Sequence, residues 1–222
     1  MSGDSPTLLA IDTATEQAGV GVLADGRVTA LSWHAGRNHT VMLMSSVHQA
    51  MTLAGIVPSE LDGVVVSLGP GTFTGLRVGM ATAKGFVLAA GLPLIGVPTL
   101  HAAALPWLGG DAEVTAVVHA GRGRLVWGTY AGDAIDPQEI APACNGTPEE
   151  LIAALGMRES AQVVTGEVDG TVALALLGLG VQVPAAPLRV RRPEALLTVG
   201  AARYAIGAFD DAALLEPFYL SR

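Results

Sequence analysis

The first hundred residues alternate short apolar runs with longer stretches of helical periodicity. We predict strands over residues 7–13, 18–24 and 27–33, because each is short, apolar and bounded by turn-forming residues. Asp25-Gly26 lies between the last two runs and is typical of a hairpin turn. The rest of this region is predicted to form a helix over 38–54 with Asn38 as its N-cap, a strand over 63–67, a helix over 76–90 ended by Gly91, and a strand over 94–97. This order of elements indicates an α/β fold.

From Pro98 onward the same kind of pattern repeats in a weaker form. The predicted elements are strands over 114–119, 125–131 and 162–165, and helices over 149–155, 172–177 and 193–209. Residues 184–187 are predicted to be a loop, and the last residues, 215–220, an extended tail. We therefore predict two lobes, over residues 1–100 and 101–222, with the last segment packing back on the first lobe.

The connection between the strand at 63–67 and the following helix is rich in glycine. It reads Gly69-Pro70-Gly71-Thr72-Phe73-Thr74-Gly75-Leu76-Arg77. Glycines of this kind let the backbone approach a ligand or another chain segment closely. The spacing fits neither a P-loop, which ends in Gly-Lys-Ser/Thr, nor the dinucleotide fingerprint. We interpret the segment as a shaped turn, and leave a structural role and a binding role both open at this point.

Three further stretches carry a family resemblance together with this loop. They are Leu8 to Thr15, Asn38-His39-Thr40 at the start of a helix, and the closing Glu216 to Leu220. With them the chain resembles the TsaB (YeaZ) family of bacterial tRNA-modification proteins, densely over residues 7–100 and again at the last few residues. The resemblance implies an actin-like ATPase fold of the RNase H-like class, with two lobes of mixed sheets flanked by helices.

The same resemblance implies a function and partners. Members of the family are understood as non-catalytic accessory subunits that bind and organise the related enzyme TsaD. TsaD transfers a threonylcarbamoyl group to adenine 37 of tRNA. The implied partners are a TsaD-like subunit in a heterodimer, a small TsaE-like ATPase, and a second copy of the chain when it is alone. Contact with tRNA is expected to be indirect only.

Composition argues against direct, strong RNA binding. The formal net charge is −8, whereas a protein that holds tRNA through its phosphates carries a basic patch. The main arginine cluster is Arg189-Val190-Arg191-Arg192, which is too small for a tRNA footprint. Half of the residues are apolar and only 14% are charged, which is consistent with a protein interface or with a biased residue usage.

The number of cysteines and the length of the apolar runs exclude an internal disulfide, a cysteine zinc site and a membrane span. The single cysteine, Cys144, rules out an internal disulfide and a cysteine zinc site. The apolar regions at 85–97 and 172–181 are broken by glycine or proline and are too short to span a bilayer. With no signal peptide visible, we expect a cytoplasmic protein that does not contact membranes.

Asp12, Thr13 and Thr15 form the candidate cofactor-binding group. They follow the first strand, where a carboxylate suits Mg²⁺ and small residues leave backbone N–H groups free for phosphate. Ala14 stands where actin-like ATPases have glycine, and the second acidic loop, at 165–170, lacks a clean turn. Local capping by Asp12 and a vestigial nucleotide site remain open, and no cofactor is predicted. The alternative function is an ATP-dependent small-molecule kinase that uses Asp12.

No catalytic residue and no metal site are predicted. Metal-binding relatives of this family carry two histidines four residues apart, but the position four after His39 is Leu43. His48, nine residues on, would point to the opposite side of the helix. Ser45 and His48 can be drawn into a triad, but no nucleophile-elbow sequence supports a peptidase.

The helix at 38–54 has a broader apolar surface than one packing face needs. At 100° per residue its apolar side chains span an arc of roughly 200°, whereas one packed face needs roughly 100°. We predict that the surplus contacts a partner, although burial of the whole arc by the chain's own lobes is the alternative. The predicted interface consists of His39, Met42, Leu43, Met44, Val47 and Met51, with Leu76, Met80 and Ala83 from the next helix.

One segment departs from the family pattern. Between residues 117 and 130 we expect an acidic residue and an arginine in a D-A-R-x-x-E-like sequence, but those places hold His119, Gly121 and Arg124. We therefore carry over no function for this segment.

Overall fold

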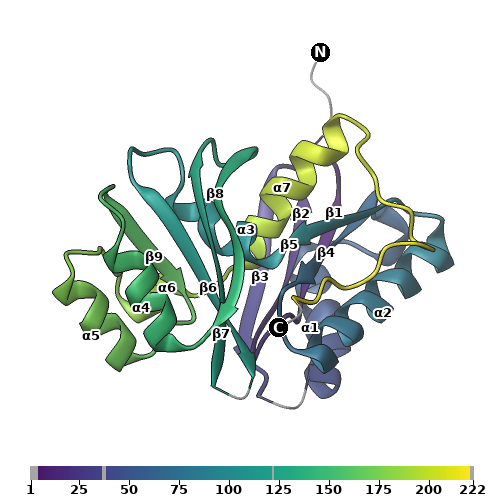
Figure 1. Ribbon diagram of the computed structural model, residues 1–222. Helices are drawn as coiled ribbons and strands as arrows, with labels where there is room; N and C mark the ends of the chain where they lie inside the picture. Colours follow the sequence, from purple (N-terminus) through teal and green to yellow (C-terminus); the bar gives the residue numbers. More distant parts are fainter. Residues whose placement is uncertain (1–4, 37–38, 122, 221–222) are drawn as a thin grey trace.

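Two mixed β-sheets stand side by side, with helices between them and on both outer faces (Figure 1). The computed structural model describes residues 5–36, 39–121 and 123–220, except for the side chain of His39. The first sheet has the order β3-β2-β1-β4-β5 and the second the order β8-β7-β6-β9. The strands of the first sheet are β1 (Leu8–Asp12), β2 (Gln17–Ala24), β3 (Arg27–His34), β4 (Gly63–Gly69) and β5 (Leu94–Pro98). Those of the second are β6 (Glu113–Gly121), β7 (Arg124–Gly132), β8 (Pro137–Gly146) and β9 (Gln162–Gly166).

Strand direction in the first sheet fixes where its loops meet. β1 pairs antiparallel with β2 and parallel with β4, with Ile11 opposite Val66. Because the carboxyl ends of parallel strands lie at one edge, residues 12–15 come to lie beside the glycine-rich loop that follows β4.

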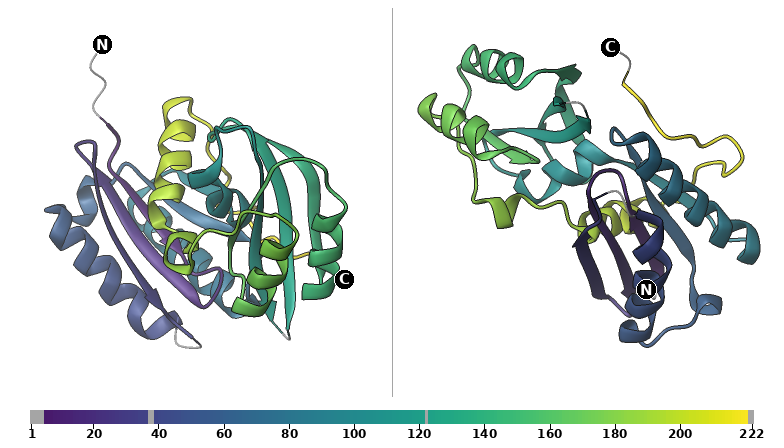
Figure 2. Two further views of the ribbon diagram at one scale, coloured as in Figure 1. Left: turned by 90° about the vertical axis from the view of Figure 1, so that its left-hand side faces the viewer. Right: turned by 90° about the horizontal axis from the view of Figure 1, so that it is seen from below.

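Helices α1 (His39–Ala54) and α2 (Phe73–Ala90) cover one face of the first sheet and lie side by side (Figures 1 and 2). Their inward side chains form one apolar core with β1, β2 and β4. The helix residues of this core are Leu43, Val47, Ala50 and Met51 from α1 and Met80, Ala83 and Val87 from α2.

The other face of the first sheet is covered by α3 (Thr99–Ala104) and α7 (Pro193–Ala205), which lie between the two sheets (Figure 2). Leu196 and Leu197 of α7 pack against Leu8 and Val65 of the first sheet. Leu100 of α3 packs in a separate core on the second sheet. α4 (Pro148–Gly156) and α5 (Gly170–Gly178) cover the outer face of the second sheet. Three short helices complete the fold, η1 (Pro58–Glu60), η2 (Leu105–Trp107) and α6 (Ala186–Arg189).

The free edge of β5 is capped by side chains rather than by another strand. The Gly96 N–H donates to Oδ2 of Asp210 at 2.7 Å, and Arg203 donates to the Gly96 carbonyl at 2.7 Å. Arg203 and Asp210 are themselves 3.2 Å apart, and the Asp210 N–H donates to the Leu94 carbonyl at 2.9 Å. The ion pair thus occupies the hydrogen-bonding groups that an added strand would use.

The C-terminal tail crosses from the first lobe towards the second. The Phe218 N–H donates to the Leu68 carbonyl at 2.7 Å, and the rings of Tyr219 and Phe73 lie 5.6 Å apart. Leu220 packs against the core between α3 and the second sheet. The extended tail predicted from the sequence is therefore confirmed, and it connects the two lobes.

Most of the predicted elements are confirmed, and so are the turn at Asp25-Gly26 and the helix end at Gly91. Asp25 and Gly26 have φ values of 50° and 70°, and Gly91 ends α2 with a φ of 66°. α2 begins at Phe73 rather than 76, because the Thr72 hydroxyl accepts a hydrogen bond from the Gly75 N–H and caps the helix. The predicted N-cap, Asn38, lies outside the described residues.

The remaining differences lie in the second half of the chain. β8 was not predicted, because it begins at Pro137, contains Pro142 and is an edge strand with irregular register. α3 was missed because it is only six residues long. The final helix ends at Ala205 rather than 209, and Ala186, predicted in a loop, begins α6. None of the helices in the described part of the chain is long and apolar enough to cross a membrane.

Candidate functional site

A polar cleft of about 470 Å³ lies between the lobes, at the edge where β1 ends. Its walls come from the β1–β2 hairpin, the end of β6, the loop between β9 and α5, and the segment that precedes α7. The charged and polar side chains that define it are Glu16, His34, Thr72, His119, Glu167, Asp169, Arg189 and Arg191. Asp12 lies directly behind Arg191.

Arg191 is the centre of the site. Its side chain is almost fully buried, and its Nε lies 2.5 Å from Oδ2 of Asp12. Its Nη2 donates to Oδ1 of Asp12 at 3.2 Å, to the Thr15 hydroxyl at 3.1 Å and to the Gln17 carbonyl at 2.9 Å. This two-point contact between guanidinium and carboxylate is the strong form of a charge-assisted hydrogen bond.

Glu167 brings a second carboxylate to the same arginine from the other lobe. It lies 3.5 Å from Nη1 of Arg191, accepts a hydrogen bond from the Thr15 hydroxyl, and accepts the His119 N–H at 2.8 Å. Burial lowers the pKa of Arg191, but the charges of Asp12 and Glu167 outweigh burial and raise that pKa above its ordinary value. The arginine therefore stays charged and ties the two lobes together.

The candidate cofactor-binding residues are brought together but are already engaged. Asp12 is paired with Arg191 and also accepts the Ala14 N–H at 3.0 Å, while the Thr13 hydroxyl donates to the Gly75 carbonyl at 2.7 Å. A carboxylate held by a guanidinium is not a free ligand for Mg²⁺. Within the described ranges, no group of three or more His, Cys, Asp or Glu side chains is placed to hold a metal ion.

The glycine-rich loop supports this arrangement through close backbone packing. A methyl group on Gly71 would lie 2.1 Å from the Ala14 carbonyl oxygen, and one on Gly75 would lie 2.1 Å from that of Thr13. On Gly69, whose φ is 111°, it would lie 2.4 Å from the Phe218 carbonyl oxygen. Only glycine fits at these positions, which gives the loop a structural role of holding residues 13–14.

Two side chains at the start of α2 lie on the outside of the same loop. The guanidinium of Arg77 stacks 3.7 Å from the ring centre of Phe73, which is 56% exposed. Phe73 in turn contacts Tyr219 of the tail.

The arginine cluster at 189–192 is largely internal. Arg189 donates to the carbonyls of Pro184, Gly166 and Val168, and burial lowers its pKa. With Arg191 buried as well, only Arg192 of the three is exposed. Arg189 and Arg191 therefore make internal contacts at the polar cleft, and the cluster has little exposed positive charge for binding a phosphate backbone.

The predicted partner interface needs correction for six of its residues. Leu43, Val47, Met51, Leu76, Met80 and Ala83 are at most 4% exposed. All of them except Leu76 belong to the core between α1, α2 and the first sheet, and Leu76 is buried as well, so in this structure the six offer no surface to a partner. The predicted interface was too wide, because the central part of the apolar arc on α1 is the face that packs on the chain's own sheet. The His39 side chain lies outside the described residues.

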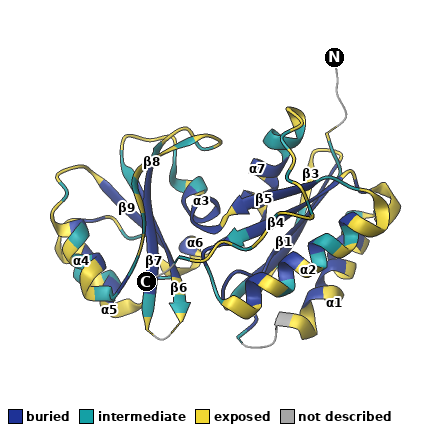
Figure 3. Ribbon diagram, turned by 45° about the vertical axis from the view of Figure 1, so that its right-hand side comes forward, coloured by how far each residue is buried: buried dark blue, intermediate teal, exposed yellow. Residues whose placement is uncertain are grey.

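The flanks of that packing face are nevertheless open. On α1, Met42 and Met44 are 47% and 53% exposed, and Val41 and Leu53 are more exposed still. On α2, the exposed apolar side chains include Phe73 and Leu88. Figure 3 shows the outer faces of α1 and α2 as largely exposed ribbon.

The segment that departs from the family pattern forms the β6–β7 turn at the rim of the polar cleft. His119 contributes its backbone N–H to Glu167, and Gly121 has a φ of 77°. Arg124 faces away to β8, where it donates to the side chain and the carbonyl of Asn145 at 2.8 and 2.6 Å. The three residues thus have local structural contacts.

Sequence reasoning missed the pairing of Arg191 with Asp12 and Glu167. Arg191 belongs to a basic cluster in the sequence and Glu167 to an acidic loop. Nothing local indicates that Arg191 meets Asp12, which is 179 positions away, or Glu167, which is 24 positions away.

Comparison with known proteins places the chain in a family. The model of the TsaD family, described as tRNA N6-adenosine threonylcarbamoyltransferase, matches residues 16–183. The tRNA threonylcarbamoyladenosine biosynthesis protein TsaB of Escherichia coli is 38% identical over 128 residues, which cover 57% of this chain and 55% of that protein. The chain thus spans about half the length of that curated relative. An uncharacterized protein of Mycobacterium tuberculosis, Rv3421c, is 33% identical over 85% of this chain and 93% of its own length.

Solved structures agree with this placement. YeaZ from Pseudomonas aeruginosa superimposes with a TM-score of 0.79 at 25% identity, over 97% of this chain and all of that one. A Bacteroides thetaiotaomicron protein with an actin-like ATPase fold matches with a TM-score of 0.51 at 8% identity, over 88% of this chain and 96% of that one. The second likeness concerns the fold alone. The predicted α/β actin-like fold is confirmed, and the chain belongs to the TsaD family and, within it, to the TsaB (YeaZ) proteins.

Proposed function

We propose that this chain is a non-catalytic accessory subunit that binds a TsaD-like partner through the outer faces of α1 and α2. In this role it supports threonylcarbamoyl transfer to adenine 37 of tRNA in the cytoplasm. One observation carries the proposal, namely the exposed apolar side chains on both helices. Exposed apolar surface of this kind on adjoining elements is typical of a protein interface.

The charge distribution supports an indirect role towards tRNA. The net charge is −8, and the main arginine cluster is mostly buried in the polar cleft. The partner, rather than this chain, would supply the basic surface that binds the tRNA phosphates. A TsaE-like ATPase as a third subunit, and a homodimer of the free chain, follow from family likeness.

The kinase alternative is not favoured. A kinase of this fold needs a free carboxylate for Mg²⁺, whereas both Oδ atoms of Asp12 contact Arg191. We expect no saturable Mg-ATP binding by the isolated chain in isothermal titration calorimetry. Micromolar affinity that Asp12→Ala abolishes would restore the kinase reading.

The interface is tested by adding charge to its exposed part. Met44→Glu should weaken the complex with the TsaD-like partner at least tenfold, because a carboxylate buried between apolar surfaces loses its hydration. Met157→Glu is the matched control, since Met157 is 80% exposed on the other lobe. Both variants should keep the wild-type melting temperature, and both are measured by light scattering and titration with the purified partner.

Two outcomes would overturn the interface. One is wild-type affinity of Met44→Glu, and the other is equal weakening by both variants. Met51→Glu does not serve this test, because Met51 is 4% exposed and the charge would enter the core.

A further inference from the structure

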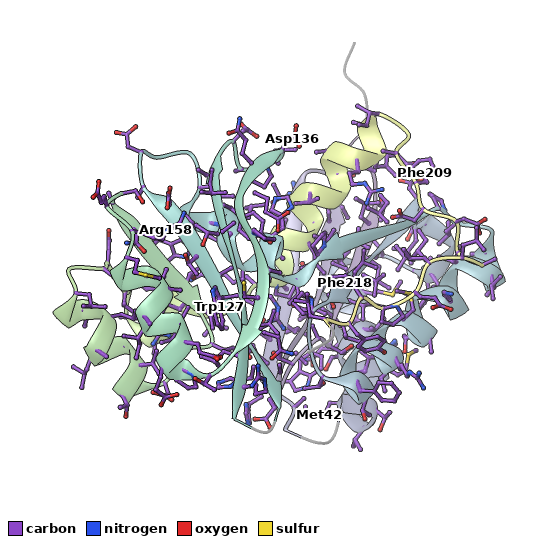
Figure 4. All side chains as sticks on the ribbon, in the orientation of Figure 1. Met42, Trp127, Asp136, Arg158, Phe209 and Phe218 are labelled. Carbon is purple, nitrogen blue, oxygen red and sulfur yellow. The ribbon has the colours of Figure 1, made fainter. Side chains whose placement is uncertain are left out.

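A second cleft lies between the lobes and shares none of the residues that line the polar cleft. Its volume is about 1020 Å³, and it is formed by α7, the β7–β8 hairpin, the end of β4 and the C-terminal tail. We call it the apolar cleft. Figure 4 labels two residues that line it, Asp136 beside β8 and Phe218 on the tail.

The walls of the apolar cleft are hydrophobic and partly open to solvent. Leu100 and Val199 are buried at its base, whereas Ile206 and Phe218 are 79% and 50% exposed. Four prolines and Leu220 also line it. An open hydrophobic hollow of this size lies at the upper end of the range for small-molecule sites.

Tyr130 supplies a hydrogen-bonding group on the wall. The residue is 9% exposed, and its hydroxyl makes no hydrogen bond to any residue that the structure describes. Burial, with a smaller effect of Glu139, raises the pKa of Tyr130 to about 12, so the hydroxyl remains a donor throughout the physiological pH range. The nearby His101 ring is occupied, since its Nε2 lies 3.0 Å from the Ala134 carbonyl oxygen.

Two carboxylates give the cleft an excess of negative charge. Glu139 lies opposite Tyr130 in the β7–β8 ladder, and Asp136 lies just before β8. Among the described residues, neither has a cationic partner within 4.0 Å. The cation on the walls, Arg203, is committed to Asp210 and to the Gly96 carbonyl.

We propose that the apolar cleft binds a small amphipathic organic cation, with an aromatic or aliphatic body and a protonated amine. The body would lie against the hydrophobic walls, and the ammonium would lie near Glu139 and Asp136. Two aromatic residues, Tyr130 and Phe218, line the cleft and suit the same ligand, because aromatic rings attract cations. The oxygen of the neutral Tyr130 hydroxyl can accept a hydrogen bond from the ammonium group.

Three probes that differ by one feature each test this site on the full chain. Phenethylamine carries both features, hydrocinnamate replaces the amine by a carboxylate, and ethylamine lacks the ring. In a titration followed by NMR, phenethylamine should bind saturably and shift resonances of β8, α7 and residues 216–220. The other two probes should bind at least tenfold more weakly.

Variants of the chain locate the probe. Glu139→Gln combined with Asp136→Asn should weaken phenethylamine binding at least fivefold, the effect of about one lost charge contact in water. Glu159→Gln removes a charge from an exposed loop outside the cleft and should leave the affinity unchanged. Ala202→Phe, which fills the cleft from α7, should abolish binding.

Clear results would overturn the proposal. These are absence of saturable phenethylamine binding, equal binding of hydrocinnamate, and unchanged affinity in the double carboxylate variant. If Ala202→Phe does not fold, the exposed double variant still decides, because Glu139 and Asp136 make no ion pair that the fold needs. Binding of arginine-rich peptides without binding of phenethylamine would also reject a small-molecule site.

Discussion

The two helix layers on the first sheet have opposite surroundings. α3 and α7 lie between the two sheets, so that both sides of this layer are covered. α1 and α2 cover the other face of the same sheet, and no second sheet covers their outer side, although Tyr219 of the tail contacts Phe73 of α2. Both layers contain many alanine, glycine and aliphatic residues, yet only the outer layer exposes large apolar side chains such as Val41 and Leu88.

This difference shows what apolar composition alone leaves undecided. A hydrophobic helix is enclosed when a second sheet of the chain covers it, and it remains available to a partner when none does. The packing tolerance of each layer should differ accordingly. Substitutions in the enclosed layer and at its entrance should cost stability, whereas equivalent changes on the outer layer should not.

The largest expected effect on stability is at Arg191, just before α7, one of the two helices enclosed between the sheets. Arg191→Met should lower the free energy of unfolding by about 3–5 kcal/mol, because it leaves Asp12 buried without its cation. Urea denaturation measures the change. Arg192→Met is the matched control, since Arg192 is exposed and its side chain makes no cap hydrogen bond to α7.

Adding Asp12→Asn to Arg191→Met should recover part of the loss, because the buried charge is then removed as well. If Arg191→Met alone lowers the free energy of unfolding by less than about 1 kcal/mol, the ion pair with Asp12 does not stabilise the segment before α7.

A smaller loss is expected inside the enclosed layer. A methyl group on Gly200 of α7 would lie 2.5 Å from Cγ2 of Val65. Gly200→Ala should therefore lower the free energy of unfolding by about 1–3 kcal/mol through overpacking, less a helix-propensity gain of about 1 kcal/mol. Thermal unfolding followed by circular dichroism measures the net change. A higher melting temperature would contradict the close packing of α7.

The smallest effect has the opposite sign and lies on the outer layer. Gly85 of α2 is exposed, and a methyl group there would meet nothing within 4 Å. Gly85→Ala should raise the free energy of unfolding by about 0.5–1 kcal/mol, because alanine favours helix more than glycine does. The same denaturation assay tests the sign. Destabilisation would mean that the outer layer of the monomer is already packed against something.

Local sequence rules predicted the first lobe well. Apolar runs gave β1 to β5, and Asp25-Gly26 and Gly91 marked a turn and a helix end through conformations that the structure contains. The second lobe was harder, because β8 is interrupted by prolines and owes its strand form to pairing with β7. Tertiary pairing decides such a strand, and local preference does not.

The site was predicted only in part, for a reason of the same kind. Asp12 and Thr15 were recognised from their place after a strand, but their state depends on Arg191, which is distant in the sequence. At the edges of the apolar arc of α1 the side chains are exposed, as predicted, but Leu43 and Val47 are buried. Helical periodicity gives the width of an apolar face and does not show what covers it.

The Arg203–Asp210 cap on β5 bears on how the protein behaves when it is concentrated. An uncovered outer strand is a template onto which strands of neighbouring molecules can add, and such addition grows into insoluble aggregates. With the Gly96 amide and carbonyl held by two oppositely charged side chains, this border of the sheet is closed to that growth. The molecule can therefore expose apolar side chains on α1 and α2 while the backbone of β5 at Gly96 is not available for strand addition.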